Sequence, residues 1–439
     1  MACSGCITSA ESVLIQSQSD EEVKKVLKDT NIVKIVSISP QSLASLSSTL
    51  QSSVDLVKMM RRLSSKLKSI GFDYVFDVTF ARHLSLIEMS NEFKRKQREN
   101  LPLLASACPG WVCYAEKTHS ELLPFISQVK SPQQIMGTLV KDWFSKKLNK
   151  SPEQIYHVTI MPCYDKKLEA SRQDFYSDIF NTRDVDCVLT TGEISKLFDG
   201  NVNFNDEVHD EHLESEEESI IPHHIQHPGT SSGSYLHNLI NLMSADLNKV
   251  RLETHSPRNL SDFVEYKLIN DETGECVFKG IKCFGFKNIQ NIVRRIGKDK
   301  GLNVSKGAGG KGISRVRGRK NNEDEKSIDF VEVMACPSGC INGGGQLKPN
   351  IDEEGFKRNW ENEGVLVNLD DKVRYDTKNH IKKVEDLYWS NNEYNKQNKQ
   401  NEEMIENFTN EFLNVLNEKL LTQYHAIEFN ESNNLNVQW

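Results

Sequence analysis

The residues whose types and spacing most directly indicate chemistry in this chain are two cysteines four positions apart, Cys336 and Cys340. Residues 327–334 before them are largely apolar and β-branched, which predicts a buried strand. Three glycines at 343–345 follow and let the backbone turn and approach a bulky group closely. Such a pair of thiolates is typical of a metal or iron–sulfur site. The alternative is a buried cysteine pair beside a turn, because free cysteine is commonly buried.

Two further cysteines stand where an apolar stretch meets a turn. Cys108 precedes a Pro-Gly turn at 109–110, and Cys163 follows the strand-like residues 155–160. Sites in open α/β folds are built at the carboxyl ends of strands. Cys108, Cys163, Cys336 and Cys340 together supply the four thiolates that a 4Fe–4S cluster requires.

The segments around these cysteines resemble the three signature segments of iron-only hydrogenases: SACPGW at 106–111, MPCYDKKLE at 161–169 and MACPSGCINGGGQ at 334–346. The resemblance is closest to the hydrogenase-like iron–sulfur assembly factors of the eukaryotic cytosol, a family that includes the nuclear prelamin A recognition factor. It covers residues 31–390, with further likeness at 422–426.

The resemblance implies an α/β fold of two lobes with a 4Fe–4S cluster buried between them. Cys108 would come from one lobe and Cys163 from the other, while Cys336 and Cys340 would come from the loop that closes the site. Lys166 would lie beside the negatively charged cluster. In the hydrogenases, the residue that matches Lys166 holds a diatomic ligand of an additional di-iron subsite.

Two positions argue against hydrogenase catalysis. Active hydrogenases carry a proton-transferring cysteine immediately before the residue that matches Cys108, and Ala107 stands there in this chain. Their proton relay continues through acids; Glu92 is present here, but Met89 replaces an expected acid. Ser127 remains at another relay position. Because a methyl or thioether group cannot exchange a proton, we expect no general acid–base catalysis and no enzyme activity.

The resemblance therefore implies a non-catalytic factor of cytosolic iron–sulfur protein assembly. Such a factor passes clusters from a scaffold to a targeting complex and on to cytosolic and nuclear apoproteins, which makes scaffold proteins, the targeting complex and the apoproteins its partners. We expect it in the cytoplasm, with the nucleus as a further location. The alternatives are an iron-only hydrogenase and an interaction protein of the prelamin-binding type.

The chain begins with a C-x2-C pair, Cys3 and Cys6, which is half of a ferredoxin-type pattern. In the resembled family further cysteines precede this pair. We therefore interpret residues 1–24 as the remnant of an N-terminal iron–sulfur module, whose 4Fe–4S cluster is complete only with the upstream cysteines restored. The alternative is an unstructured terminus with free thiols.

Residues 25–393 are predicted to form the two-lobed core. Strands are expected at 32–38, 74–80 and 186–191; an apolar helical stripe between the first two predicts a β-α-β unit with a parallel strand pair. Cys187 is expected to be a core residue rather than a ligand. Ser131, followed by proline, predicts a helix that begins with a capping serine.

Two mobile inserts are predicted within this core, at about 205–228 and 297–326. The first has eight acids in 206–218, followed by His223, His224 and His227. A solvated loop is favoured there over a histidine metal site, since clustered like charges repel. The second is basic and glycine-rich, and its G-x-G-x-x-G lacks the leading strand of a dinucleotide site.

Residues 394–439 are predicted to form a C-terminal helix and a partner-binding tail. Apolar residues recur every four positions from Met404 to Leu420, which favours a helix packed on the core. The chain ends in Trp439, for which an unstructured end is the alternative interpretation. In the resembled family a terminal aromatic residue docks on the targeting complex, and physically an indole beside a terminal carboxylate offers one apolar anchor and one charge.

Composition limits the remaining classes. The 439 residues are 37% hydrophobic and 26% charged, with a formal net charge of −8, which argues against a general nucleic-acid binder. No apolar run is long enough for a membrane span, and no secretory signal is visible. Ten cysteines without such a signal indicate thiols and metal rather than disulfides.

Overall fold

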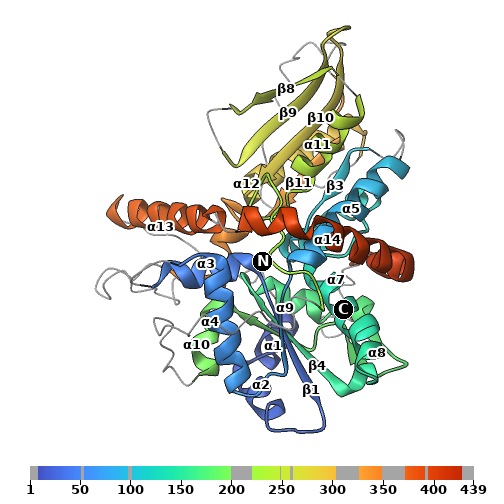
Figure 1. Ribbon diagram of the computed structural model, residues 1–439. Helices are drawn as coiled ribbons and strands as arrows, with labels where there is room; N and C mark the ends of the chain where they lie inside the picture. The colour runs from blue at the N-terminus through green and yellow to red at the C-terminus, as the bar shows by residue number, and fades with distance from the viewer. Residues whose placement is uncertain are drawn as a thin grey trace, which may run out of the picture.

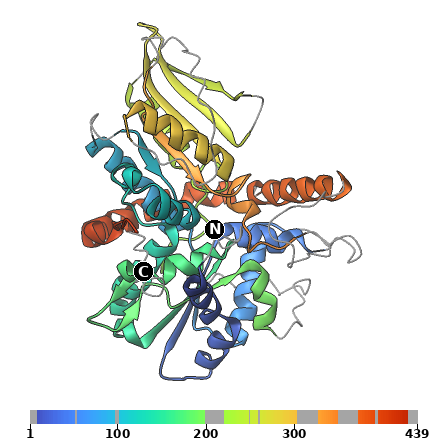
Figure 2. The ribbon, with the colours of Figure 1, turned by 180° about the vertical axis from the view of Figure 1, so that it is seen from behind.

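The computed structural model describes residues 8–50, 54–96, 101–198, 220–247, 249–257, 261–302, 326–348, 371–390 and 394–427. Two sheets lie at opposite ends of the molecule, and helices α13 (Asp371–Trp389) and α14 (Tyr394–Leu416) cross it between them (Figures 1 and 2). This arrangement confirms the expected two-lobed α/β architecture. Among the described residues no helix has the length and apolarity needed to cross a membrane.

The first sheet is the lower one in Figure 1, and all four of its strands are parallel. Parallel strands buried on both faces read as near-continuous apolar runs, as this sequence does. In spatial order the strands are β2 (Tyr74–Asp77), β1 (Val33–Ile38), β4 (Ile155–Met161) and β7 (Cys187–Thr190).

The second sheet combines a parallel half with an antiparallel half. β3 and β10 both pair in parallel with β11, whereas β9 and β8 continue the sheet as antiparallel strands. In spatial order the strands are β3 (Leu103–Ala105), β11 (Phe330–Met334), β10 (Cys276–Phe284), β9 (Phe263–Asn270) and β8 (Val250–His255).

Helices surround both sheets, and a short hairpin lies apart from them. The remaining α-helices and the hairpin strands are α1 (Ser9–Ser17), α2 (Asp20–Val26), α3 (Pro40–Ser48), α4 (Leu56–Ser69), α5 (Thr79–Arg95), α6 (Pro109–Thr118), α7 (Pro132–Thr138), α8 (Ser145–Lys147), α9 (Asp165–Ala170), α10 (Ile194–Leu197), α11 (Tyr235–Leu247), α12 (Phe286–Asp299), β5 (Tyr176–Ser177) and β6 (Thr182–Arg183).

The strand period of two divides the buried apolar side chains into separate cores. In β11, Phe330 and Met334 face a core that reaches into both sheets, while Val331 packs on the opposite face. In β1, Ile35 joins that shared core and Val36 faces away from it. Each fully buried side chain of this size contributes about 1.5–3 kcal/mol. The shared core therefore fixes the two sheets relative to each other.

Most predicted elements are confirmed, with shifted ends. The predicted β-α-β unit contains a parallel β1–β2 pair, with α3 and α4 between the strands. The strand predicted at 74–80 is wrong beyond Asp77, where Asp77 Oδ1 accepts the Thr79 N–H at 2.9 Å and α5 begins. Such an Asx turn ends a strand despite the β-branched residues that follow.

Parts of both ranges predicted as mobile inserts belong to the fold. Ile221 and Ile225 are buried, so the segment 220–228 packs against the core. Residues 294–299 belong to α12, with Ile296 buried in a core cluster, so the predicted insert boundary at 297 falls inside a helix. Residues 199–219 and 303–325 lie outside the described part of the chain.

The C-terminal helix packs as its apolar stripe predicts. Phe412, Leu416 and Leu420 are all buried in the core shared by the two sheets. Phe412 contacts the Trp143 ring at a centroid distance of 4.7 Å. Helix α14 therefore belongs to the folded core, and the chain leaves it toward residues 422–426.

A buried polar cluster positions the turn at residues 230–234. Arg82 on α5 donates to the carbonyl oxygen of Thr230 at 2.8 Å and to the hydroxyl of Ser234 at 2.8 Å. Glu332 on β11 accepts the backbone N–H groups of Ser234 at 3.0 Å and Leu236 at 2.9 Å. Burial raises the pKa of Glu332, while these N–H groups and Arg82 act to lower it. This turn carries Ser232, which contacts one of the candidate cysteines.

We predict that Arg82→Met lowers the free energy of unfolding by about 3–5 kcal/mol, because buried acceptors and the Glu332 charge lose their compensating cation. The measurement is the urea unfolding midpoint. Arg251→Met is the control, because Arg251 forms exposed ion pairs on β8 with Glu253 and Asp271, and its midpoint should stay close to that of the native chain. Equal midpoints for the two variants would contradict the role assigned to Arg82.

Candidate iron–sulfur centre

Two candidate cysteines follow neighbouring strands of the second sheet. β3 and β11 pair in parallel with Ala105 opposite Glu332, so their carboxyl ends lie side by side. The Ser106 hydroxyl donates to the carbonyl oxygen of Val333 at 2.6 Å, and the Ala335 N–H points at Cys108 Sγ at 3.4 Å. Cys108 therefore lies beside the chain that leads directly into Cys336.

Cys163 follows β4 at the carboxyl edge of the first sheet, and the glycine run contacts its loop. The Gly345 N–H donates to the carbonyl oxygen of Pro162 at 2.9 Å. A Cβ atom added to Gly343 would lie 2.3 Å from that same oxygen, so only glycine fits. The loop that carries Cys340 is thus held against the residue preceding Cys163.

Cys340 lies in a single 3-10 turn, Gly339–Asn342, directly before the glycines. Its N–H donates to the Ser232 hydroxyl at 2.8 Å. Gly339 has a φ of +76°, and a Cβ there would lie 2.1 Å from the same hydroxyl oxygen. Ser232 therefore positions the turn, a role that sequence reasoning missed because Ser232 is 108 residues from Cys340.

Burial and neighbouring charges change the pKa values of two of the candidate thiols. Burial raises the pKa of Cys108, and burial together with the nearby Cys108 raises the pKa of Cys340 to about 11, while Lys166 acts in the opposite direction. Thiols with raised pKa values hold their protons at neutral pH when no metal is bound. A metal that binds them must displace those protons, because the thiolate is the ligand.

Lys166 is buried near these thiols, and its ammonium has two polar side-chain partners. Its Nζ lies 2.6 Å from Glu169 Oε2 and donates to the Ser131 hydroxyl at 3.0 Å. Ser131 is the N-cap residue of α7, as predicted, but its side chain makes no capping hydrogen bond. The capping interpretation of that side chain is therefore wrong, because the hydroxyl is used by Lys166 instead.

The donor set fits an iron–sulfur cluster. Cys108, Cys163, Cys336 and Cys340 are all free of disulfides and partly buried. They follow strands β3, β4 and β11, and the glycine contact joins the two strand edges. Four thiols with an N–H directed at one sulfur are the chemistry by which proteins bind such clusters. Cys187, by contrast, is buried in β7 as a core residue, as predicted.

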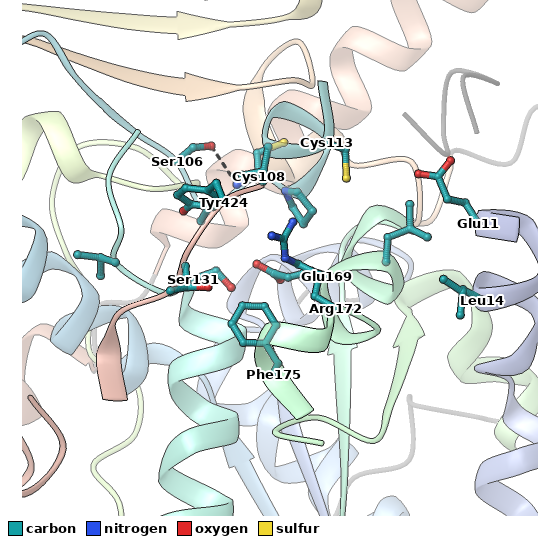
Figure 3. A pocket seen from close by; sticks show the side chains of 16 residues that line it. Glu11, Leu14, Ser106, Cys108, Cys113, Ser131, Glu169, Arg172, Phe175 and Tyr424 are labelled. Carbon is teal, nitrogen blue, oxygen red and sulfur yellow. Dashed lines mark hydrogen bonds between the residues drawn. The ribbon is translucent and has the colours of Figure 1, made fainter. Parts of the chain in front are cut away.

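A narrow cavity borders this region on the side of Ala107 and Cys108 (Figure 3). Its volume of about 30 Å³ has room for roughly two water molecules. Tyr424, from the segment after α14, lies over it together with Ser131 and Arg172 (Figure 3). The Tyr424 hydroxyl donates to the carbonyl oxygen of Ser127 at 2.8 Å.

Arg172 and Glu116 hold this wall of the cavity in place. Arg172 makes a two-pronged ion pair with Glu116, at 2.9 and 2.8 Å, and Glu116 also accepts the His425 N–H at 3.0 Å. Sequence reasoning did not assign these roles. The likeness at 422–426 was the available signal, because it marked a segment far from the cysteines as part of the same unit.

The positions that match the proton relay of hydrogenases are only partly polar. The Ser127 hydroxyl donates to Glu92, which also accepts the Gln128 N–H at 3.0 Å. Met89 is fully buried in the apolar core shared by the sheets. Ala107 borders the cavity and packs against that same core. The serine and glutamate therefore remain paired, while apolar side chains occupy the other two positions.

Three predicted site residues cannot be placed. Cys3, Cys6 and Trp439 lie outside the described residues. Their roles stay predictions from the sequence. The described chain that follows the first two cysteines is helix α1, whose Glu11 forms an ion pair with Lys117 at 2.7 Å.

Comparison with known proteins agrees with this fold. Residues 33–344 match the family described as "Iron only hydrogenase large subunit, C-terminal domain", which defines the class as hydrogenase-like. A solved structure of a variant of the FeFe-hydrogenase HydA1 from Chlamydomonas reinhardtii superposes with a TM-score of 0.63. That likeness covers 93% of this chain and 99% of the hydrogenase chain at 19% sequence identity, so it shows the fold alone.

Curated relatives narrow the class. The cytosolic Fe-S cluster assembly factor NAR1 of Cryptococcus neoformans is 40% identical, over 89% of this chain and 74% of its own length. Cytosolic iron-sulfur assembly component 3 of Mus musculus is 40% identical, over 100% and 85%. The cytosolic Fe-S cluster assembly factor narfl of Danio rerio is 39% identical, over 99% and 98%. The chain belongs to this family of hydrogenase-like cytosolic iron–sulfur cluster assembly factors.

Proposed function

We propose that this protein is a non-catalytic factor of cytosolic iron–sulfur protein assembly that binds one 4Fe–4S cluster through Cys108, Cys163, Cys336 and Cys340. The observation that supports this most is the contact between the two cysteine-bearing edges. The Cys340 loop is fastened to Pro162 through Gly345, and Cys108 lies beside the chain that enters Cys336. The names of the relatives support the place of this chemistry in iron–sulfur assembly.

Two features favour binding over hydrogen catalysis. Ala107 and Met89 interrupt the positions through which protons would move. The Lys166 ammonium is already engaged by Glu169 and Ser131. The hydrogenase-like fold is thus used as a cluster holder in this proposal.

The wider proposal concerns transfer and location. The protein would receive clusters from a scaffold and pass them, through a targeting complex, to cytosolic and nuclear apoproteins. Its place of action is the cytosol, as the names of its relatives indicate. Cys3 and Cys6 would be two of the four ligands of a second, N-terminal 4Fe–4S cluster, which forms only when upstream sequence supplies the other two.

We predict that Cys340→Ala abolishes the cluster. Removing one thiolate leaves one iron without its ligand, and the buried site offers little water to replace it. The measurement is iron and acid-labile sulfide per chain after anaerobic purification, together with the visible absorption of the cluster. The native chain should hold about four irons at this site, the number in a 4Fe–4S cluster.

Cys276→Ala is the matched control for this variant. Cys276 is a partly buried free thiol at the opposite end of β10 from the candidate centre, and its sulfur contacts only the carbonyl oxygen of Phe278 among the contacts described. It should keep full iron and sulfide. A Cys340→Ala protein with as much cluster as this control would refute the ligand assignment, and a native chain without iron would favour a cluster-free interaction protein.

We predict that the reconstituted protein evolves no hydrogen from a chemically reduced dye, because the relay positions held by Ala107 and Met89 carry no exchangeable proton. Ala107→Cys alone should not restore activity, because Met89 still interrupts the relay and no di-iron subsite is expected in this chain. The measurement is gas chromatography of the headspace, with an active hydrogenase as positive control. Turnover by the unmodified chain would overturn the non-catalytic part of the proposal.

The proposed docking of Trp439 generates a further prediction. An aromatic anchor carries a large share of binding energy, and a terminal carboxylate can be captured by backbone donors. Deleting Trp439 should therefore lower affinity for the cytosolic targeting complex at least tenfold, about 1.4 kcal/mol. Cluster content should not change. The measurement is a quantitative pull-down against the purified complex.

Trp439→Phe is the control for the deletion, because it keeps an aromatic ring and the terminal carboxylate. We expect it to retain most of the affinity. If the deletion variant binds as well as the intact chain, the tail has no docking role. The cluster proposal would be unaffected, because it depends on residues 108–340 and not on the tail.

A further inference from the structure

A second group of metal-binding side chains lies at the carboxyl end of β2, away from the four cysteines. Asp77 is the last residue of that strand and is 1% exposed. His223 and His224 reach it from the segment that precedes α11. One ligand atom from each of the three residues lies within 4.8 Å of the other two. The sequence alone favoured a solvated loop for these histidines, and the structure instead packs them on the fold.

The two carboxylate oxygens of Asp77 have different partners: one accepts hydrogen bonds from Thr79, and the other faces His224. Its Oδ1 accepts the Thr79 N–H at 2.9 Å and the Thr79 hydroxyl at 2.6 Å. Its Oδ2 accepts the His224 N–H at 2.6 Å and lies 3.4 Å from His224 Nδ1. The carboxylate is therefore fixed in orientation before any ligand arrives.

His224 adopts a backbone conformation that non-glycine residues rarely use. Its φ is +58°, in the left-handed region. This conformation brings both its N–H and its imidazole to the same Asp77 oxygen. Strained backbone of this type persists only where surrounding contacts enforce it, and it is concentrated at functional sites.

His223 supplies an observation that a purely structural role does not explain. Its Nε2 is buried and has no hydrogen-bond partner among the described residues. The ring is held edge-on to Phe76 at 5.7 Å and to His224 at 5.9 Å. A buried nitrogen without a partner costs about 1–3 kcal/mol. The turn that Asp77 forms with Thr79 explains why a carboxylate is buried here. It does not explain why a histidine nitrogen is buried beside it without a partner among the described residues.

We propose that Asp77, His223 and His224 bind a divalent transition-metal ion of the zinc class. Two imidazoles and one carboxylate are a common donor set for zinc, with a water completing a tetrahedron. Ligand atoms in such a tetrahedron are about 3.3 Å apart, given metal–ligand distances near 2.0 Å. The Asp77 and His224 atoms already have about this separation, at 3.4 Å, and the ligand atom of His223 lies within 4.8 Å of both.

This site is separate from the candidate iron–sulfur centre. Asp77 is in register with Ile38, and Ile38 with Ile160, so Asp77 lies two strand spacings from β4. That is about 10 Å along the sheet edge. Cys163 follows β4 on the same edge. The proposed ion therefore shares no ligand with the cluster, and either site can be tested without removing the other.

The test is zinc binding by the full-length, cluster-loaded protein. The chain is dialysed anaerobically against micromolar zinc chloride and desalted, and zinc, iron and sulfide are measured together. The native chain should bind one zinc more than His223→Gln, and His224→Asn should show the same loss. Asparagine is chosen at 224 because it tolerates the left-handed region. His255→Gln, which changes an exposed histidine on β8, is the control and should bind as the native chain does.

Two further measurements distinguish loss of the metal site from loss of the fold. Cobalt(II) bound at this site should give the intense visible absorption of low coordination, and both variants should lose it while retaining native iron content. Zinc should also raise the melting temperature of the native chain and of His255→Gln, because an ion that binds only the folded state stabilises it. Equal zinc content in the native chain and in His223→Gln, or a zinc affinity reduced less than tenfold by both variants, would overturn the proposal.

Discussion

The contact between the glycine run and the loop before Cys163 is the constraint on which the candidate centre depends. Residues 343–345 pass so close to Pro162 that a single methyl group at 343 would lie 2.3 Å from its carbonyl oxygen. Gln346 continues the connection, since it donates to Gln41 at 3.0 Å and accepts from Thr191 at 2.6 Å. The loop after β11 is thus fastened to residues that follow β1, β4 and β7. One segment of backbone joins the carboxyl edges of both sheets.

The contact with Pro162 holds the Cys340 turn only at the end that leads into the glycines. The start of the turn needs a second point of attachment. Ser232 provides it, because its hydroxyl accepts the Cys340 N–H, and the turn that carries Ser232 is held by Arg82 and Glu332. Both charged side chains are buried and hydrogen-bonded at several points. Buried charges of this kind stabilise little on balance, but they specify one arrangement. The apolar core sets the distance between the sheets, and the polar cluster sets the orientation of the cysteine turn.

The sequence predicted those parts of the site that are local in the chain. Each cysteine loop could be read from its own neighbours, since an apolar run, a turn and a thiol follow one another within ten residues, and β1, β4, β7 and β11 lie where these runs predicted them. Ser232, Arg82 and Tyr424 could not be read in this way. Their partners are more than 100 residues distant, and a lone serine or arginine carries no periodic signal.

The errors have similar physical causes. The segment 220–228 was assigned to a loop because of the acids before it, yet Ile221 and Ile225 are buried and Asp77 binds its backbone. The charge pattern predicts the average environment of a segment. Two apolar side chains were enough to bury part of this segment despite the acids before it. The Ser131 capping interpretation was wrong because a distant lysine uses the hydroxyl. That four cysteines bind a cluster remains a proposal, since the fold brings their loops together without testing their chemistry.

The thiols themselves explain why cluster binding in this proposal would be sensitive to acid. The pKa of Cys340 is raised to about 11 by burial and by its neighbour Cys108, so both thiols are protonated in the metal-free protein at neutral pH. Each must lose its proton to bind iron, and the apparent affinity therefore falls as the pH falls. Lys166 opposes this by favouring the thiolate of Cys340, but its ammonium is also held 2.6 Å from Glu169. The site thus combines buried thiols whose pKa values are raised with a cation whose charge Glu169 partly compensates, so the proton cost of cluster binding is only partly offset by Lys166.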